Sequence, residues 1–234
     1  MARLADTAPS GENSIGSVVQ NEGARIFFSD FLSRQFARPE GMVGRFLMGM
    51  YFNRVNAAGN TLVFDALCAR DGEIIAEIGF GGGQLLLSLC QHYRHATVHG
   101  VELSDELLAR MRAVQQRSGP DNLELHAGSV ESLPFADDSL DAIASVNTVY
   151  FWPSLNSGFV ELARVLKPGG RLVLGYGSAQ HLAQRGYRQR GFALHSPAEL
   201  SAAASACGLQ EDALFSVERG GRGPFIAQRL VKPG

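Results

Sequence analysis

Lysine and cysteine are scarce in this 234-residue sequence, and each scarcity narrows the possible chemistry. Only Lys167 and Lys232 are present, so a Schiff-base enzyme or a Tyr–Lys dehydrogenase is not expected. The three cysteines, Cys68, Cys90 and Cys207, have no second ligand at metal-binding spacing. Neither a disulfide nor a bound metal is therefore predicted, and we expect each cysteine to be a small buried apolar residue.

Long apolar runs and an excess of charge are also missing. The sequence has neither a signal peptide nor an apolar run of about 18 residues, which predicts a soluble, cytoplasmic protein with no membrane span. The net charge of −2 does not provide the basic face of a nucleic-acid-binding protein. Hydrophobic residues make up 45% of the chain, enough for one α/β domain with an appendage. The sequence does not define an oligomeric state.

The most informative pattern is an apolar strand followed by a glycine cluster and then helical spacing. The strand ends in Glu77, and the glycines are Gly79, Gly81 and Gly83. Gly79 permits a sharp turn, while the other two let a ligand approach the backbone. A dinucleotide site would need its third glycine at position 84, which is Gln84. A pyrophosphate site is therefore not predicted here.

A second strand, predicted over 97–103, also ends in an acid. Glu102 lies 23 residues beyond Gly79, about where a βαβ unit places the acid that binds ribose hydroxyls. A carboxylate suits this task because it can accept hydrogen bonds from both hydroxyls. Ser104 then follows as the predicted N-cap of a helix.

The rest of the chain alternates between the two periodicities, as an α/β fold requires. The spacing predicts strands over 123–126, 141–146 and 171–174, helices over 154–166 and 196–206, and a final hairpin over 210–219 and 224–232. Between Gly175 and Ser196 lies a long polar insert that contains His181 and His195. Such an insert is either a functional loop or a solvated segment.

The N-terminal part has a different composition. Residues 1–20 are small and polar, which predicts a disordered tail. Six of the fourteen phenylalanines and three of the five methionines fall between residues 27 and 52. This segment is either a helix pair packed on the domain or a lid whose Met/Phe face contacts a lipophilic substrate.

Together the E-x-G-x-G-x-G pattern, the acid at position 102, the Leu-Pro-Phe loop and the Lys-Pro-Gly-Gly turn resemble class I S-adenosylmethionine-dependent methyltransferases. The resemblance covers roughly residues 42–232. It implies an α/β fold with a doubly wound, seven-stranded, mostly parallel sheet (the Rossmann-like methyltransferase fold) and an N-terminal helical cap. The corresponding boundaries are a tail over 1–20, a cap or lid over 21–70 and a cofactor-binding domain over 71–234.

The resemblance also implies S-adenosyl-L-methionine as the cofactor. In the family, the acid at the Glu77 position serves the methionine end, and an Asp usually holds the adenine amino group where Ser129 stands here. A neutral hydroxyl is a weaker acceptor than a carboxylate. Tyr51, with an amide from Asn53, Asn56 or Asn60, is a candidate for the cofactor carboxylate; Asn56 or Asn60 could instead cap a helix. The predicted cofactor-binding residues are Tyr51, Glu77, Gly79, Gly81, Gly83, Glu102, Leu103, Ser129, Val130 and Asn147.

The predicted activity is methyl transfer to a small, apolar or aromatic molecule, mainly by positioning and desolvation. The candidate catalytic residues are Asn147, Tyr150, His181 and His195. Amino methyltransferases that act on nucleic acids carry Asn/Asp-Pro-Pro-aromatic after the strand that corresponds to 141–146 here. The chain keeps Asn147 and Tyr150 but has neither proline, so it stays open whether nitrogen, oxygen or carbon is methylated. Two alternatives are a nicotinamide-dependent oxidoreductase and a catalytically inactive partner subunit that binds S-adenosylmethionine.

Overall fold

The structure, a computed structural model, describes residues 57–234. The expected tail over 1–20, most of the expected cap over 21–70 and Tyr51 lie outside the described residues. The strands are β1 (Ile74–Ile78), β2 (Thr97–Glu102), β3 (Leu123–Ala127), β4 (Leu140–Val146), β5 (Leu166–Gly177), β6 (Gln210–Val217) and β7 (Phe225–Val231). The α-helices are α3 (Ala57–Leu67), α4 (Gln84–His92), α5 (Asp105–Ser118), α6 (Leu155–Val165), α7 (Ala179–Gln184) and α8 (Pro197–Ser205).

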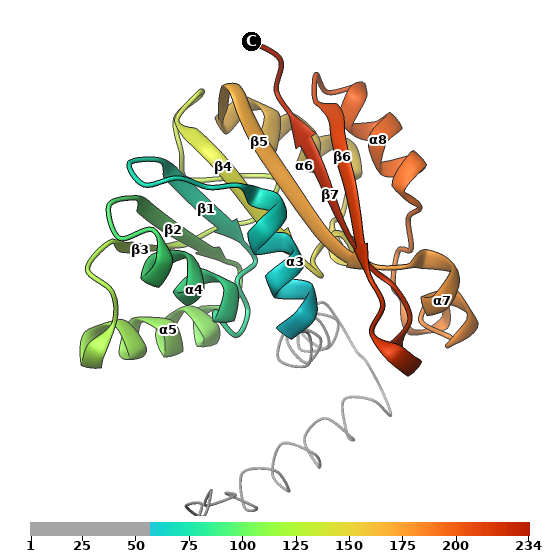
Figure 1. Cartoon of the computed structure of the whole chain (residues 1–234), viewed down its shortest axis with the longest axis horizontal. Helices are drawn as coiled ribbons and strands as arrows, with labels where there is room; N and C mark the ends of the chain where they lie inside the picture. The colour runs from blue at the N-terminus through green and yellow to red at the C-terminus, as the bar shows by residue number, and fades with distance from the viewer. Residues whose placement is uncertain (1–56) are drawn as a thin grey trace, which may run out of the picture. The chain divides into compact units, whose positions relative to one another are not determined.

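The strands form one seven-stranded sheet in the order β3-β2-β1-β4-β5-β7-β6 (Figure 1). The pairs from β3 to β5 are parallel, and β7 is antiparallel to both β5 and β6. The predicted α/β sheet with a C-terminal antiparallel hairpin is confirmed. The strand order reverses between β1 and β4, and ligands of open α/β sheets bind beyond the carboxyl ends of strands at such a point.

Two apolar clusters fill the two faces of the sheet. One joins α3, α4 and α5 to the sheet and includes Phe80, Leu86 and Met111. The other joins α6, α7 and α8 to the opposite face and includes Phe159 and Leu200. Figure 1 shows α3, α4 and α5 on one side of the sheet. The parallel strands are therefore covered on both faces, which explains their nearly continuous apolar sequences.

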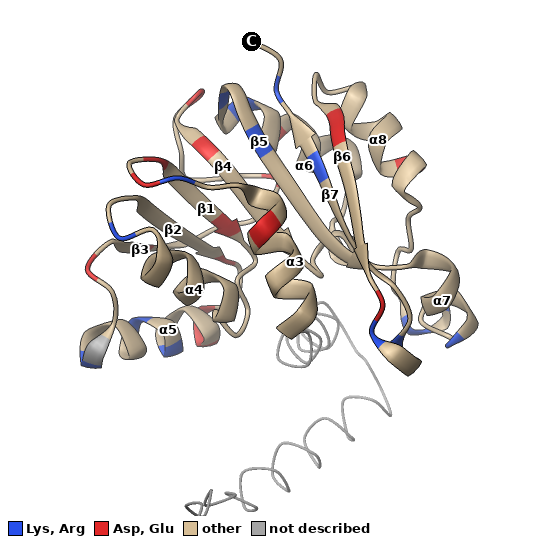
Figure 2. Cartoon of the chain, in the orientation of Figure 1, with Lys and Arg blue, Asp and Glu red and all other residues tan. Residues whose placement is uncertain are grey.

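Local signals place most helix starts where the sequence predicts them. The Ser104 hydroxyl accepts a hydrogen bond from the Leu107 N–H at the start of α5. Ser196 and Glu199 form a full capping box at the start of α8. Lys/Arg and Asp/Glu residues are interspersed over the described elements (Figure 2). Within residues 57–234, no helix is both long and apolar enough to cross a membrane. The cytoplasmic location stays a prediction.

Three local predictions differ from the structure. Strand β5 begins at Leu166 rather than near 171, because Leu166 already pairs with Leu140 before the Lys-Pro-Gly-Gly bend. Of the two alternatives for the polar insert, the solvated segment is wrong: the insert contains α7 and a 3-10 turn (Arg188–Arg190), and it buries apolar side chains such as Phe192. Of the cysteines, Cys90 is buried and Cys207 partly so, but Cys68 is exposed just after α3.

Candidate active site

The turn from β1 to α4 supplies one wall of a pocket. Gly79, Gly81 and Gly83 have φ angles of 74°, 53° and 71°, in the left-handed region that favours glycine. A Cβ atom on Gly79 would lie 2.6 Å from the Thr148 side chain, and one on Gly83 would lie 1.9 Å from Met111. The glycines therefore allow both the tight turn and the close packing of this wall against β4 and α5.

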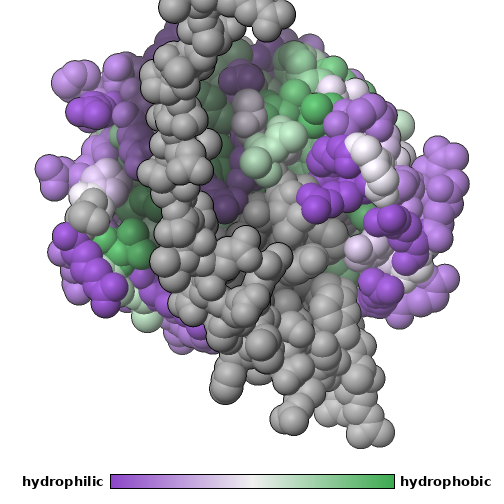
Figure 3. Space-filling view, turned by 60° about the horizontal axis from the view of Figure 1, so that its bottom comes forward, coloured by the Kyte–Doolittle hydropathy of each residue, from purple (hydrophilic) through white to green (hydrophobic). Residues whose placement is uncertain are grey.

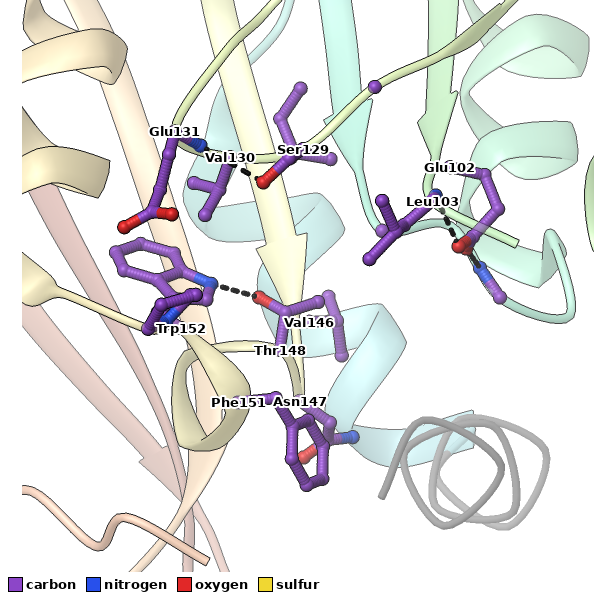
Figure 4. A pocket seen from close by; sticks show the side chains of 15 residues that line it. Glu102, Leu103, Ser129, Val130, Glu131, Val146, Asn147, Thr148, Phe151 and Trp152 are labelled. Atoms are coloured by element: carbon purple, nitrogen blue, oxygen red, sulfur yellow. Dashed lines mark hydrogen bonds between the residues drawn. The ribbon is translucent and has the colours of Figure 1, made fainter. Parts of the chain in front are cut away.

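Glu102 closes the opposite wall at the end of β2. One carboxylate oxygen accepts hydrogen bonds from the Leu103 and Ser104 N–H groups, at 2.6 and 3.0 Å. The other accepts one from the Gly81 N–H at 3.0 Å (Figure 4). Burial raises the pKa of Glu102 above its ordinary value, and these three hydrogen bonds oppose that rise. The carboxylate is thus fixed in orientation: Oε1 accepts two of these hydrogen bonds and Oε2 one, so Oε2 retains a lone pair for a ligand.

Between these walls lies a pocket of about 300 Å³ at the carboxyl ends of the strands. Figure 3, which turns the lower edge of Figure 1 toward the viewer, shows hydrophobic surface beside hydrophilic surface on this side of the described chain. The residues lining the pocket are Ile78, Gly79, Gly81, Glu102, Leu103, Gly128, Ser129, Val130, Glu131, Val146, Asn147, Thr148, Phe151, Trp152 and Pro153. Most of them are apolar or glycine, with a few converging polar groups, as in small-molecule sites.

A chain of hydrogen bonds fixes the aromatic end of the pocket. The Trp152 indole N–H donates to the Thr148 hydroxyl at 3.1 Å (Figure 4). The Thr148 and Ser145 hydroxyls are 2.6 Å apart, and Ser145 donates to the Ile78 carbonyl at 2.7 Å. Since Ser145 uses its proton on Ile78, it accepts the proton of Thr148, and Thr148 accepts that of Trp152. The indole is therefore tied to both β1 and β4.

Two buried side-chain atoms near this pocket have no hydrogen-bond partner among the described residues. Asn147 lines the pocket with a left-handed φ of 57°, and its Nδ2 is buried with no hydrogen-bond acceptor. Glu77 does not line the pocket, and its buried Oε2 accepts no hydrogen bond. Burial raises the pKa of Glu77 well above its ordinary value. An ionised ligand with both a carboxylate and an ammonium group could satisfy such atoms.

The predicted cofactor residues are only partly brought together. Seven line the pocket: Gly79, Gly81, Glu102, Leu103, Ser129, Val130 and Asn147. Gly83 contributes to the turn, and Glu77 lies behind it on β1, outside the lining. Ser129 uses its hydroxyl oxygen to accept the Glu131 N–H at 3.3 Å. The individual roles of these residues stay predictions.

Of the four candidate catalytic residues, only Asn147 lines this pocket. The buried Tyr150 hydroxyl accepts a hydrogen bond from the Gly177 N–H at 2.5 Å, and burial raises its pKa. The His181 ring packs against Gly223 of the C-terminal hairpin. His195 is partly buried just before α8, and burial lowers its pKa.

Several lining residues are absent from the sequence-based site. Thr148, Phe151 and Trp152 follow β4 directly, so position alone could have identified them, because strand ends face the ligand. Glu131 brings a carboxylate to the same side of the pocket as Trp152 (Figure 4). No sequence signal separates Glu131 from the other surface acids, because it lies in an irregular loop.

Comparison with known proteins agrees with this geometry. Residues 76–174 match the family described as "Methyltransferase domain". The structure of YcgJ from Bacillus subtilis superposes with a TM-score of 0.62 at 19% identity, over 76% of this chain and 99% of that chain. The family match and the shared fold therefore support the predicted resemblance to class I S-adenosylmethionine-dependent methyltransferases.

Curated relatives match over part of their length. The chain is 28% identical over 119 residues to an uncharacterized methyltransferase, YdaC, of Bacillus subtilis, which is 51% of this chain and 64% of that protein. It is 32% identical over 100 residues to a fatty-acid O-methyltransferase of Mycolicibacterium smegmatis, which is 43% of this chain and 35% of that protein. The match thus spans less than two thirds of either relative.

Proposed function

We propose that this protein transfers a methyl group from S-adenosyl-L-methionine to a small, apolar or aromatic molecule. The observation that carries the proposal is Glu102, a buried carboxylate held by three backbone N–H groups on the wall of an apolar pocket. A carboxylate oriented in this way, with a lone pair of Oε2 still available, is suited to accept a hydrogen bond from a ribose hydroxyl.

The remaining lining residues fit the other parts of the cofactor. Leu103 is 56% exposed, and with Val130 it offers apolar surface for a flat base. Ser129 provides a hydroxyl oxygen as a hydrogen-bond acceptor for an amino group. At the other end, the unpartnered Asn147 Nδ2 is a donor for a carboxylate. Bound in this way, the cofactor would supply a methyl group already activated by its sulfonium.

The acceptor is proposed to bind at the end formed by Phe151, Trp152 and Pro153. Phe151 packs edge-on against Phe192 at 4.9 Å between ring centroids, which extends the aromatic surface behind the pocket. Such surface favours an apolar or aromatic ligand. The similarity to a fatty-acid O-methyltransferase is consistent with a lipophilic acceptor.

The protein's own contribution would be positioning and exclusion of water. Holding the acceptor in line with the methyl group, at about 3–3.5 Å, can supply about 7–11 kcal/mol of the barrier. Asn147 is the polar group placed to orient either reactant, and the hydroxyl chain through Thr148 keeps the Trp152 wall rigid. A general base is needed only if the acceptor keeps its proton at neutral pH. Tyr150 is poorly suited to that role, because burial raises its pKa and its oxygen already accepts a backbone hydrogen bond.

Calorimetry separates this proposal from its alternatives. The full chain should bind S-adenosylmethionine and S-adenosylhomocysteine, and should not bind NAD. NAD binding without S-adenosylmethionine binding would favour the nicotinamide-dependent oxidoreductase. The inactive partner subunit is distinguished by a turnover assay. A screen of fatty acids, phenols and small heterocycles, monitored through S-adenosylhomocysteine release, should find an acceptor, whereas binding without turnover on any of them would favour the inactive subunit.

A further inference from the structure

Two histidines and a glutamate from neighbouring strands share one face of the sheet, away from the proposed methyl-transfer pocket. In the parallel register of β2 and β3, His99 lies opposite Glu124, and Val101 lies opposite His126. Since side chains alternate along a strand, His99, Glu124 and His126 all point to the same face. A Cβ on Gly100 would contact Leu86 and other residues on the α4 face, so the three polar residues face the opposite side.

The three side chains approach one another closely. His99 Nδ1 is 3.0 Å from His126 Nε2 and 3.5 Å from a Glu124 carboxylate oxygen. The same carboxylate oxygen is 3.9 Å from His126 Nε2. A point equidistant from these three atoms lies about 2.0 Å from each, which equals the usual distance from zinc to imidazole nitrogen and carboxylate oxygen of about 2.0–2.2 Å. The side chains are therefore already spaced as a first coordination shell, without any movement of the backbone.

The surroundings favour ligation. Burial lowers the pKa of both His99 and His126, although the Glu124 carboxylate opposes that shift. Phe135 packs against both rings, at 5.1 and 5.4 Å between centroids, and restricts their rotation. Glu124 is 59% exposed, so one side of the cluster is open to solvent and to an incoming ion.

We propose that His99, Glu124 and His126 bind one divalent transition-metal ion, of which zinc is the expected type, with solvent completing the coordination. Two imidazoles and one carboxylate suit zinc, cobalt or nickel better than calcium or magnesium, which prefer oxygen ligands alone. Among residues 57–234 this is the one group of at least three potential ligands brought together in this way. The sequence does not predict this site, because His99 and Glu124 are 25 residues apart and become neighbours only when β2 and β3 pair.

The position of the site suggests a structural task. β3 is an edge strand, paired on one side with β2. A metal ion would link the two strands through their side chains, one residue before β3 ends at Ala127. Gly128 and Ser129, which line the pocket, follow directly. An ion here would stabilise the edge of the sheet and the loop that is proposed to receive the adenine end of the cofactor.

A hydrogen bond between the two rings is the competing explanation of the same contact. His99 Nδ1 and His126 Nε2, at 3.0 Å, can share one proton without any metal. Metal binding requires both nitrogens to be unprotonated, with each ring keeping its proton on the other nitrogen. The two states make different predictions for added metal.

The test uses the full-length, tag-free chain, stripped with a chelator and dialysed. Zinc chloride is titrated by calorimetry, and cobalt chloride is followed by visible absorption. We expect one ion per chain, a d–d absorption typical of nitrogen and oxygen ligation, and a higher melting temperature with zinc. Glu124→Gln keeps the size of an exposed side chain and should bind at least tenfold more weakly, and His126→Ala should bind more weakly still.

His95→Ala is the matched control, because His95 is an exposed histidine outside the cluster. It should bind zinc as tightly as the parent. The proposal is overturned if the parent chain binds no zinc or cobalt at millimolar concentration, or if Glu124→Gln and His126→Ala bind as tightly as His95→Ala. None of these measurements depends on methyl transfer, so the metal site and the proposed activity can fail independently.

Discussion

The Gly81 N–H donates a 3.0 Å hydrogen bond to the Glu102 carboxylate and so connects the glycine turn after β1 to the acid at the end of β2. The two residues are 21 positions apart in sequence. The turn and the acid are therefore parts of one structure, and the acid is oriented before any ligand binds. Preorganisation of this kind reduces the cost of ordering a binding site.

Glu102→Ala should weaken the binding of S-adenosylmethionine by about 1.5–3 kcal/mol, roughly ten- to a hundredfold, because a charge-assisted pair with the ribose hydroxyls is lost. Glu102→Gln keeps one oxygen and should show a smaller loss. The measurement is calorimetry, with thermal melts to confirm that each variant is folded. Glu106→Ala, an exposed acid on α5, is the control and should bind normally. If Glu102→Ala binds S-adenosylmethionine as tightly as the parent, Glu102 does not bind the ribose.

Much of the fold is predictable from sequence because its signals are local. Apolar runs define the strands, and Ser104 and Ser196 mark helix starts by their capping chemistry. The glycine turn and Glu102 are predictable for the same reason, since each occupies a strand end. In contrast, nothing local distinguishes Tyr150 as a side chain that hydrogen-bonds to Gly177 rather than facing the ligand.

The place of Thr148 after β4 is predictable from position, but its role depends on tertiary contacts. Its hydroxyl joins Ser145 to Trp152, a network that exists only after β4 and the following 3-10 turn (Val149–Phe151) have formed. From sequence, the polar insert is expected to be either a functional loop or a solvated segment, because arginine, histidine and glutamine residues are spread along it. Its apolar side chains, such as Phe192, nevertheless pack into the core.

Thr148→Val should destabilise the protein by about 1–3 kcal/mol, because the Trp152 N–H loses its acceptor and the Ser145 hydroxyl loses its donor in a buried site. Thr148→Ser keeps the hydroxyl and serves as the matched control, with a much smaller effect expected. The measurement is urea unfolding followed by tryptophan fluorescence, which reports on Trp152 because it is the sole tryptophan. Equal stability of the two variants would contradict the proposed hydrogen-bond chain.

Gly83→Ala should lower the free energy of unfolding by about 1–2 kcal/mol, because a non-glycine residue is strained at a φ of 71°. The new methyl group would also displace the end of Met111. Gly82→Ala is the control in the same turn, since a Cβ there meets nothing within 4 Å and its φ is not in the left-handed region. Chemical denaturation of both variants tests this, and a Gly82→Ala loss as large as that of Gly83→Ala would contradict it.

Glu77 should make stability depend on pH. Its pKa is raised in the folded protein, chiefly by burial, so the unfolded chain releases the Glu77 proton at lower pH than the folded chain does. The Glu77 contribution to stability is therefore fully present below the ordinary carboxyl pKa and is lost as pH rises through the folded pKa. We expect Glu77→Gln to gain stability relative to the parent as pH increases above about 4.5. Unfolding curves of both proteins at several pH values test this, and a constant difference between them would contradict it.

His181→Ala and His195→Ala should each reduce turnover less than about tenfold, well short of the 10²–10⁴ loss expected on removing a general base. Neither side chain lines the described pocket, and His181 packs instead against the hairpin at Gly223. The assay measures kcat with an acceptor from the screen, corrected for the folded fraction because loss of the His181 ring could affect packing. Asn147→Ala is the comparison, and it should lower both cofactor affinity and kcat, because Asn147 does line the pocket. A thousandfold loss of kcat in either histidine variant, with cofactor affinity unchanged, would identify that histidine as the base and contradict a mechanism dominated by positioning.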